Sequence, residues 1–375
     1  MFSKHQLLAA VSIGCLMGFC MMPLNASAQS AKETPTATMK AEMQQADKDM
    51  GVVLKKLQDL GAKPVSTLSV EQARKQPTPA DAVKAVLKDG GKDATAIMAA
   101  LKITRKDMAY PAGGATQPVR IYTPQGDAPE GGFPVIVYYH GGGFVIADLD
   151  TYEASAMALA HKTNAVVASV EYRHAPENRF PAAHEDAIAA YKWVTGNAGS
   201  LNANARRIAV AGESAGGNLA INVAIMARDQ KLQAPVHMLL VYPVADNDTN
   251  TPSYVQNAEA APLGKADMLW FFDKVLGKPD DKMNPMLDII GKADLKGLPS
   301  ATLITAQIDP LMSEGVTLAE KLKAAGSLVN YQHFSGVTHE FFGMNAVVAK
   351  AGQAQEIAAA DLKKAFAAKM TEKAP

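Results

Sequence analysis

The sequence predicts an α/β fold in which helices flank a mostly parallel central sheet. From about residue 103 onward, short apolar segments alternate with longer amphipathic or alanine-rich segments, which is typical of strands joined by helical crossovers. Glycine-rich turns follow two of the apolar segments, at residues 141–143 and 212–217. A chain of 375 residues with 48% hydrophobic residues can also bury a large core.

The expected strands are short runs rich in Val, Ile and Tyr. They lie at residues 119–124, 134–140, 165–172, 207–212, 237–243, 301–306 and 329–335. Helices are expected at about 152–162, 182–195, 215–228, 313–325 and 353–368. The alternation stops between Pro243 and Pro299, where residues 265–277 resemble a helix. We expect an insertion near 245–298 that could cover the carboxyl edge of the sheet.

The N-terminal 28 residues have the features of a secretory signal peptide. Lys4 precedes an apolar stretch at about 7–22, and an A-x-A-like site follows at 26–28. The alternative is a membrane anchor, but the stretch is shorter than the roughly 20 residues that a span needs. We expect a periplasmic or secreted protein with no stable membrane insertion after cleavage.

The rest of the N-terminal region divides by composition. Residues 29–40 are small and polar, as in a flexible leader. Helical patterns at 41–60 and 70–88 follow, and we assign 41–100 to a helical segment that precedes the main domain at 101–375.

Composition excludes several classes of protein. Both cysteines, Cys15 and Cys20, lie in the predicted signal peptide, so the mature chain has neither a disulfide nor a cysteine nucleophile. The formal net charge is zero, with 37 basic and 37 acidic residues, which indicates no nucleic-acid footprint. A small molecule is the expected partner.

Ser214 is the candidate nucleophile. It lies in "GESAGG", between a strand pattern and an alanine-rich helix pattern, which is the strand–turn–helix context of a G-x-S-x-G nucleophile elbow. The alternative is an ordinary tight turn. A serine in such an elbow needs a base, and the base needs an orienting acid, which follow in the order Ser, acid, His.

Asp309 is the candidate acid, because "QIDPL" places it directly after the strand 301–306. Its alternative role is to cap the helix that begins near Ser313. Rival acids are Asp246, Asp248 and Glu314.

His339 is the candidate base, because it follows both the serine and the last strand, in "SGVTHEFF". Other histidines precede the acid, lie within strand patterns or belong to the signal peptide. These are His5, His140, His161, His174, His184, His237 and His333.

"YHGGGF" supplies candidate donors for an oxyanion. The consecutive residues Gly141, Gly142 and Gly143 let backbone N–H groups approach a substrate oxygen, and Ala215 after the serine offers another N–H group. The sequence does not decide which glycines contribute. Phosphate binding is disfavoured, because no Gly-Lys-Ser/Thr follows.

These motifs together resemble the hormone-sensitive-lipase-like family of α/β-hydrolase carboxylesterases. The motifs "YHGGGF", "VEYRHAPENRFPAAHEDA", "GESAGGNLA", "DPL" and "HEFFGM" occur in the family's order, and the similarity extends from about Leu54 to about Met344. The resemblance implies an α/β-hydrolase fold with a helical cap, and Ser214, Asp309 and His339 as nucleophile, orienting acid and base. Members of the family often form homodimers through the last strand and helix, so the resemblance also implies a possible homodimer.

Supporting roles follow from the same resemblance. His140 would shape the glycine loop through a hydrogen bond, and Glu213 would act behind the catalytic residues. Glu171, Arg173 and Glu185 would hold loops in place.

Three positions depart from the family's pattern: His174 replaces a usual Leu, Ser313 replaces an acidic residue, and Glu340 replaces a Gly that often follows the histidine. If Glu340 faces the imidazole, we expect a raised pKa of His339 and activity shifted to higher pH.

The predicted function is hydrolysis of short- to medium-chain acyl esters through an acyl-enzyme, with no metal or organic cofactor. Amides, thioesters or acetylated sugars are alternative substrates, because fold and catalytic residues do not fix the leaving group. A receptor without catalysis is a further alternative, which the presence of His339 disfavours. The apolar residues 268–272 are candidates to wall an acyl pocket or to pack the cap.

Overall fold

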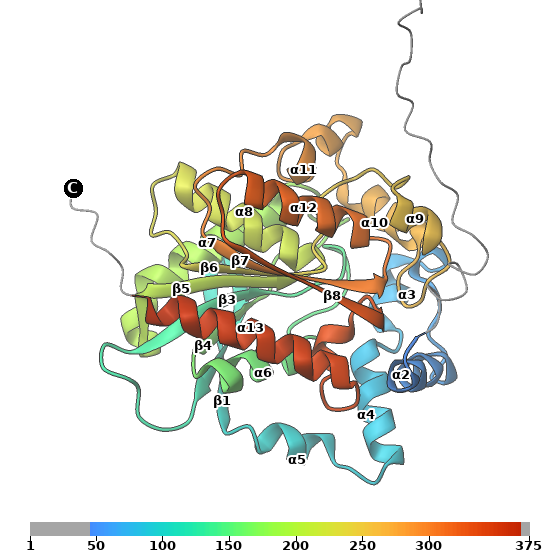
Figure 1. The fold of residues 1–375 in the computed structure, drawn as a ribbon, viewed down its shortest axis with the longest axis horizontal. Helices are drawn as coiled ribbons and strands as arrows, with labels where there is room; N and C mark the ends of the chain where they lie inside the picture. Colours follow the sequence, from blue (N-terminus) through green and yellow to red (C-terminus); the bar gives the residue numbers. More distant parts are fainter. Residues whose placement is uncertain (1–45, 369–375) are drawn as a thin grey trace, which may run out of the picture.

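The computed structural model describes residues 46–368, and within them the strands form one eight-stranded sheet (Figure 1). The strand order is β1-β2-β4-β3-β5-β6-β7-β8. The strands are β1 Ile103–Ala112, β2 Ala115–Pro124, β3 Phe133–Tyr139, β4 Val166–Val170, β5 Ala203–Glu213, β6 His237–Val241, β7 Ser300–Ile308 and β8 Val329–Thr338. From β4 to β8 in this order all neighbours are parallel. The predicted signal peptide at 1–28 and leader at 29–40 lie outside the described residues.

The sheet begins with an antiparallel hairpin that the sequence analysis missed in part. β1 pairs with β2, and β2 pairs with β4, both antiparallel. The seven expected strands are present, but β1 was not expected. Most of its side chains are exposed or half-buried, and charged residues occupy its centre, so it lacks the apolar pattern of a buried strand.

Two helical layers cover the sheet. Figure 1 shows α6 and α13 on one side and α7, α8 and α12 on the other. Alternate residues of β3 enter the two layers, with Val135 and Val137 in one hydrophobic cluster and Ile136 and Tyr138 in the other. The covering helices are α6 Glu153–Thr163, α7 Ala182–Asn197, α8 Ala215–Asp229, α12 Met312–Ala324 and α13 Ala349–Ala367. This burial on both faces is typical of a parallel sheet.

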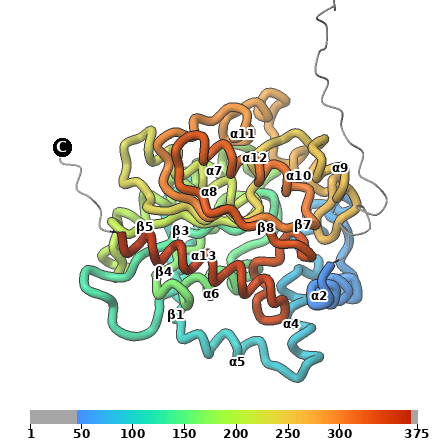
Figure 2. The backbone as a smooth tube through the Cα atoms, in the orientation of Figure 1, coloured from blue at the N-terminus to red at the C-terminus, as the bar shows by residue number. Residues whose placement is uncertain are grey.

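The first of the described N-terminal helices, α2, lies beside the chain's last strand. Figure 2 shows the α2 segment beside the segment that follows β8, and the Asp47 N–H donates to the Gly336 carbonyl at 2.7 Å. The helices are α2 Lys48–Asp59, α3 Val70–Lys75, α4 Pro79–Asp89 and α5 Ala94–Ala99. The single helix expected at 70–88 is wrong, because Thr78 caps a new helix whose first residue is Pro79.

The insertion between β6 and β7 consists of short helices. They are α9 Pro252–Gln256, α10 Lys265–Val275 and α11 Ile289–Lys292. The Trp270 indole N–H of α10 donates to the Leu68 carbonyl at 3.1 Å, and the Asp267 carboxylate accepts from the Ser66 N–H at 2.9 Å. These bonds join the insertion to the N-terminal segment.

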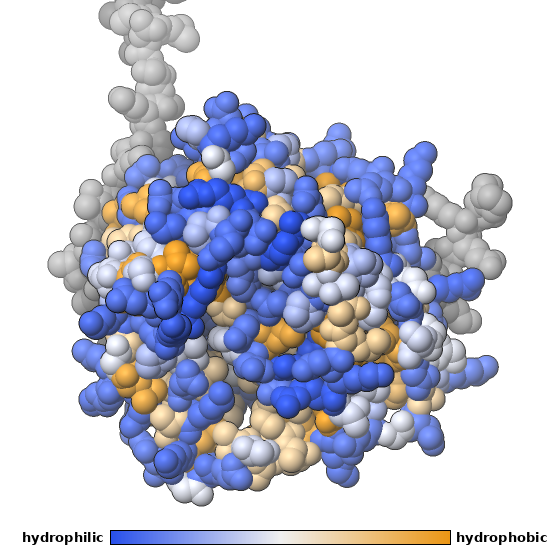
Figure 3. All heavy atoms as spheres, turned by 180° about the vertical axis from the view of Figure 1, so that it is seen from behind, coloured by the Kyte–Doolittle hydropathy of each residue, from blue (hydrophilic) through white to orange (hydrophobic). Residues whose placement is uncertain are grey.

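The surface carries scattered apolar residues. The face in Figure 3 is mainly hydrophilic, with hydrophobic residues in small groups. Between residues 46 and 368, none of the helices combines the length and hydropathy needed to cross a membrane.

We expect substitution of a buried leucine to lower the stability far more than substitution of an exposed one. Leu240 on β6 is fully buried, and we expect Leu240→Ala to lower the free energy of unfolding by about 2–5 kcal/mol, because it leaves a cavity. Leu269 on α10 is 49% exposed, so Leu269→Ala should change stability by no more than about 0.5 kcal/mol. Urea unfolding of both variants measures the difference, and equal losses would contradict the assignment of the core.

Candidate active site

Ser214 occupies the turn between β5 and α8 in an unusual backbone conformation. Its φ and ψ angles are 56° and −119°, and the residue is 4% exposed. A non-glycine residue in this region stores strain, which the surrounding structure must hold. The Ser214 N–H donates to the Val241 carbonyl at 2.9 Å, which ties the turn to β6.

The small residues around Ser214 are required by close backbone packing. A Cβ atom at Gly216 would lie 1.9 Å from the Tyr139 carbonyl oxygen, and a Cβ atom at Gly212 would lie 2.0 Å from the Gly216 carbonyl oxygen. The first turn of α8 therefore passes directly over the ends of β3 and β5. This packing explains the glycines of "GESAGG" more fully than the turn alone does.

Three side chains from different strand ends meet at this turn. The Ser214 hydroxyl donates to His339 Nε2 at 2.9 Å, and His339 Nδ1–H donates to Asp309 Oδ2 at 2.8 Å. Each residue directly follows a strand: Ser214 follows β5, Asp309 follows β7 and His339 follows β8. The carboxyl ends of parallel strands lie at one edge of the sheet, which is why the three residues meet.

Asp309 contributes both of its carboxylate oxygens. Oδ2 accepts from His339, and Oδ1 accepts from the Leu311 N–H at 2.8 Å, just before α12. Asp309 therefore holds both the loop before α12 and the imidazole of His339. The rival carboxylates are used elsewhere, since Asp246 accepts from the Asn247 N–H and Glu314 accepts from the Ala245 N–H.

The glycine loop lies beside the serine, and its members differ in position. Gly142 and Gly143 line the same cavity as Ser214 and His339. Gly142 has a φ of +93°, and a Cβ atom there would lie 2.1 Å from the Ile146 carbonyl oxygen, so glycine is required. Gly141 is not part of that lining, and its carbonyl accepts from His140 Nδ1–H at 2.8 Å. Ala215 is the first residue of α8, so its N–H has no intrahelical acceptor.

Of the loop residues named in the sequence analysis, Arg173 and Glu171 make close contacts that hold the chain, and Glu185 makes a longer one. The Arg173 guanidinium donates to the buried Asp186 carboxylate at 2.8 Å, and its contact with Glu185 is longer, at 3.4 Å. Glu171 Oε2 accepts from the Leu149 N–H at 3.2 Å.

Two further carboxyl groups, those of Glu340 and Glu213, lie near the base. Glu340 Oε1 is 3.9 Å from His339 Nε2, and its carboxylate accepts from the Tyr152 hydroxyl at 2.6 Å. Glu340 has a φ of 74°, which explains why glycine suits this position. The buried Glu213 accepts from the Tyr138 hydroxyl at 2.6 Å. Sequence analysis missed both tyrosines, because no motif marks them.

These charges change the acid–base properties of the site. Burial opposes protonation of His339, but Asp309, and then Glu340 and Glu213, outweigh it and raise the pKa of the imidazole. Burial, and then the Glu340 charge, raise the pKa of Glu213 to about 7. Asp309 and Glu340 therefore favour the protonated form of the imidazole.

A cavity of about 780 Å³ opens above the serine. The N-terminal segment contributes Leu57 and Val65 to its wall, and the insertion contributes Leu263, Met268 and Phe271. Of the apolar residues 268–272, only these last two line the cavity. Trp270 instead joins the two covering segments.

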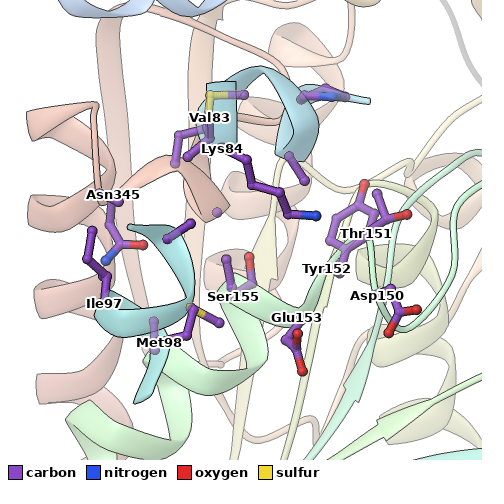
Figure 4. A pocket seen from close by; sticks show the side chains of 18 of the residues that line it. Val83, Lys84, Ile97, Met98, Asp150, Thr151, Tyr152, Glu153, Ser155 and Asn345 are labelled. Carbon is purple, nitrogen blue, oxygen red and sulfur yellow. The ribbon is translucent and has the colours of Figure 1, made fainter. Parts of the chain in front are cut away.

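A smaller cavity of about 150 Å³ adjoins the first (Figure 4). Helices α4 and α5 form one side of it with Val83, Ile97 and Met98, and the start of α6 forms the other. Tyr152 and Glu340 line both cavities, so their hydrogen-bonded pair forms part of the wall between them. Figure 4 shows the Lys84 side chain extending toward Thr151 and Tyr152.

The fold and the site define an α/β hydrolase. A family model described as the α/β hydrolase fold matches residues 136–343. The chain belongs to the hormone-sensitive-lipase-like family of α/β-hydrolase carboxylesterases, and it is a carboxylic ester hydrolase.

Similar proteins align with most of this chain. Carboxylesterase NlhH of Mycobacterium tuberculosis is 40% identical over 271 residues, which cover 71% of this chain and 83% of that protein. Ethyl acetate hydrolase of Pseudomonas putida is 33% identical over 292 residues, covering 77% of this chain and 88% of that protein. The solved structure of a thermostable esterase from Pseudomonas putida aligns with a TM-score of 0.76 at 30% identity, covering 87% of this chain and 99% of that one.

The position of Glu340 predicts a pH effect. The Glu340→Gln variant keeps an acceptor for Tyr152 but removes one of the charges that, after Asp309, raise the pKa of His339. Because the base must be unprotonated, we expect the acid limb of kcat/KM for p-nitrophenyl acetate to move to lower pH by about one unit. Glu356→Gln on the exposed face of α13 is the control. An unchanged acid limb in Glu340→Gln would refute the electrostatic role.

Proposed function

We propose that this carboxylesterase hydrolyses short- to medium-chain acyl esters through a covalent acyl-enzyme. The observation that carries the proposal is the continuous hydrogen-bonded chain from Ser214 through His339 to the buried Asp309. We assign these residues as nucleophile, general base and orienting acid. Gly142, Gly143 and Ala215 are the proposed oxyanion donors, and the position of Gly141 supports a role in shaping the loop.

The geometry supports a two-step acyl transfer. His339 Nε2 takes the proton from the Ser214 hydroxyl while the serine oxygen attacks the ester carbonyl. The backbone N–H groups stabilise the negative charge on the carbonyl oxygen, and His339 then returns the proton to the leaving alcohol. Water hydrolyses the acyl-enzyme by the same route. Asp309 holds the imidazole in the required tautomer and stabilises its charged form.

The cavity wall supports the proposed substrate range. Apolar side chains such as Met268 and Phe271 suit an acyl chain, and the Tyr152–Glu340 pair limits its extension toward α4 and α5. The similarity to ethyl acetate hydrolase points to the same range of short acyl groups.

The covering segments have a role in this proposal. We assign the N-terminal segment up to about residue 100 and the insertion near 245–298 to a cap, since both contribute to the cavity wall. Export through the signal peptide and a homodimer through β8 and α13 remain parts of the proposal. β8 is a terminal strand of the sheet, which leaves one side for pairing.

The first test is hydrolysis of p-nitrophenyl acetate, butyrate, octanoate and palmitate. We expect kcat/KM to fall steeply beyond the octanoate, because the cavity wall stops longer chains. Ser214→Ala should lower kcat by at least about 10⁴-fold, because it removes the nucleophile. Ser200→Ala, which changes an exposed serine, is the matched control.

The result separates the proposal from its alternatives. Equal rates on all four esters would contradict the chain-length limit. Hydrolysis that survives in Ser214→Ala would contradict the acyl-enzyme. Activity on amides, thioesters or acetylated sugars alone would contradict the proposed substrate class and assign a different leaving group.

The acid assignment has its own test. Asp309→Asn should lower kcat by about 10³–10⁴-fold, since the amide no longer fixes the productive tautomer of His339. Asp246→Asn changes a rival acid and should retain nearly full activity. Steady-state kinetics of both variants measure the contrast, and a larger loss in Asp246→Asn would overturn the assignment.

A further inference from the structure

A cluster of three side chains outside the catalytic triad has the composition of a metal site. His140, Glu171 and His174 each offer one ligand atom, and these atoms all lie within 4.8 Å of one another. Glu171 Oε1 is 3.5 Å from His140 Nε2 and 3.2 Å from His174 Nε2. Two imidazoles and one carboxylate are a common ligand set for Zn²⁺.

The Nε2 atoms of both histidines face Glu171 Oε1, in ion pairs that a bound cation would replace. The Nε2 atoms of His140 and His174 are both buried, and neither has a hydrogen-bond partner among the described residues. His140 is fully buried, and its Nδ1–H donates to the Gly141 carbonyl. In neutral His140 the proton on Nδ1 leaves the Nε2 lone pair for a metal ion, and a backbone carbonyl is the usual partner of the second nitrogen in a metal-ligating histidine.

The surroundings hold the three side chains in place. The Tyr172 ring stacks on His140 with centroids 4.5 Å apart and an interplanar angle of 16°. The Leu149 N–H donates to Glu171 Oε2, which leaves Oε1 facing the histidines. The side chains of Glu171 and His174 are 19% and 17% exposed, so the cluster lies close to the surface although both Nε2 atoms are buried.

The distances suit a small tetrahedral ion. With metal–ligand bonds of about 2.0–2.1 Å, neighbouring ligand atoms in a tetrahedral site lie about 3.3 Å apart. The two measured separations from Glu171 bracket this value. The three residues would supply three ligands of such a site, and water would complete it as the fourth.

We propose that His140, Glu171 and His174 form a binding site for a divalent transition-metal ion of the Zn²⁺ type. His140 directly precedes the glycine loop, so the ion would link the segment at 171–174 to the start of the loop that contains Gly142 and Gly143. The ion takes no part in ester hydrolysis. It stabilises the loop, and the site stands independently of the proposed substrate range.

Direct binding measurements test this proposal on the mature chain. After treatment with a chelator, we expect isothermal titration calorimetry to show one Zn²⁺ per chain, and Co²⁺ to give visible d–d bands of a tetrahedral site. Zn²⁺ should also raise the Tm, because a ligand that binds only the folded state stabilises it.

Variants of the ligands locate the ion. His174→Leu introduces the residue usual in the family, and Glu171→Gln keeps the size of the side chain. Each should weaken Zn²⁺ binding by at least about tenfold, since the loss of even an outer partner of a ligand costs 10–100-fold. His161→Ala removes an exposed histidine and should bind Zn²⁺ as the unchanged chain does.

Each outcome decides the proposal. Loss of the Co²⁺ bands and of the Tm increase in both ligand variants, but not in His161→Ala, supports it. Absence of Zn²⁺ binding to the unchanged chain overturns it and leaves an ordinary ion-pair cluster. Binding of equal strength in folded His174→Leu also overturns it and places the ion elsewhere, for example at His339.

Discussion

The site depends on how closely the first turn of α8 approaches the ends of β3 and β5. Gly212 and Gly216 leave no space for a Cβ atom, and this contact holds Ser214 in a strained conformation at the edge of the sheet. With the serine fixed, the loop after β7 has to position Asp309 and the loop after β8 has to position His339. The buried sheet therefore determines the geometry of the triad, and the covering segments determine the shape of the cavity.

The buried carboxyl groups of the site lower the stability of the folded protein. His339 lies near three carboxyl groups, and Glu213 is buried with a pKa of about 7. Hydrogen bonds from Tyr138 and Tyr242 partly compensate for the desolvation of Glu213. Since the ionised form of Glu213 is disfavoured in the folded state, its contribution to stability falls as pH rises from the unfolded value toward 7. The same charges favour protonated His339, the form that develops when it accepts the serine proton.

The sequence predicted the sheet and the position of the triad residues better than it predicted the covering segments. The order of apolar segments and the loop positions of Ser214, Asp309 and His339 follow from local pattern, because each lies directly after a buried strand. β1 was missed because its exposed, charged residues resemble a loop. The break at Thr78 was missed although Thr78, Pro79 and Asp81 form a capping sequence typical of a helix start, because the apolar spacing continues across it. Tyr152 could not be predicted, because its contact with Glu340 joins residues 188 positions apart.

The contact between Tyr152 and Glu340 links the pKa of the base to the shape of the substrate cavity. Glu340 is close enough to His339 to raise the pKa of the base, and it is also part of the wall between the two cavities. Tyr152 holds the Glu340 carboxylate, and its hydroxyl also fills the space that a Cβ atom at Gly141 would need. A substitution of Tyr152 or Glu340 that enlarges the cavity therefore also moves the charge beside the imidazole or loosens the glycine loop. In this chain the space for the substrate and the strength of the base are consequently not independent.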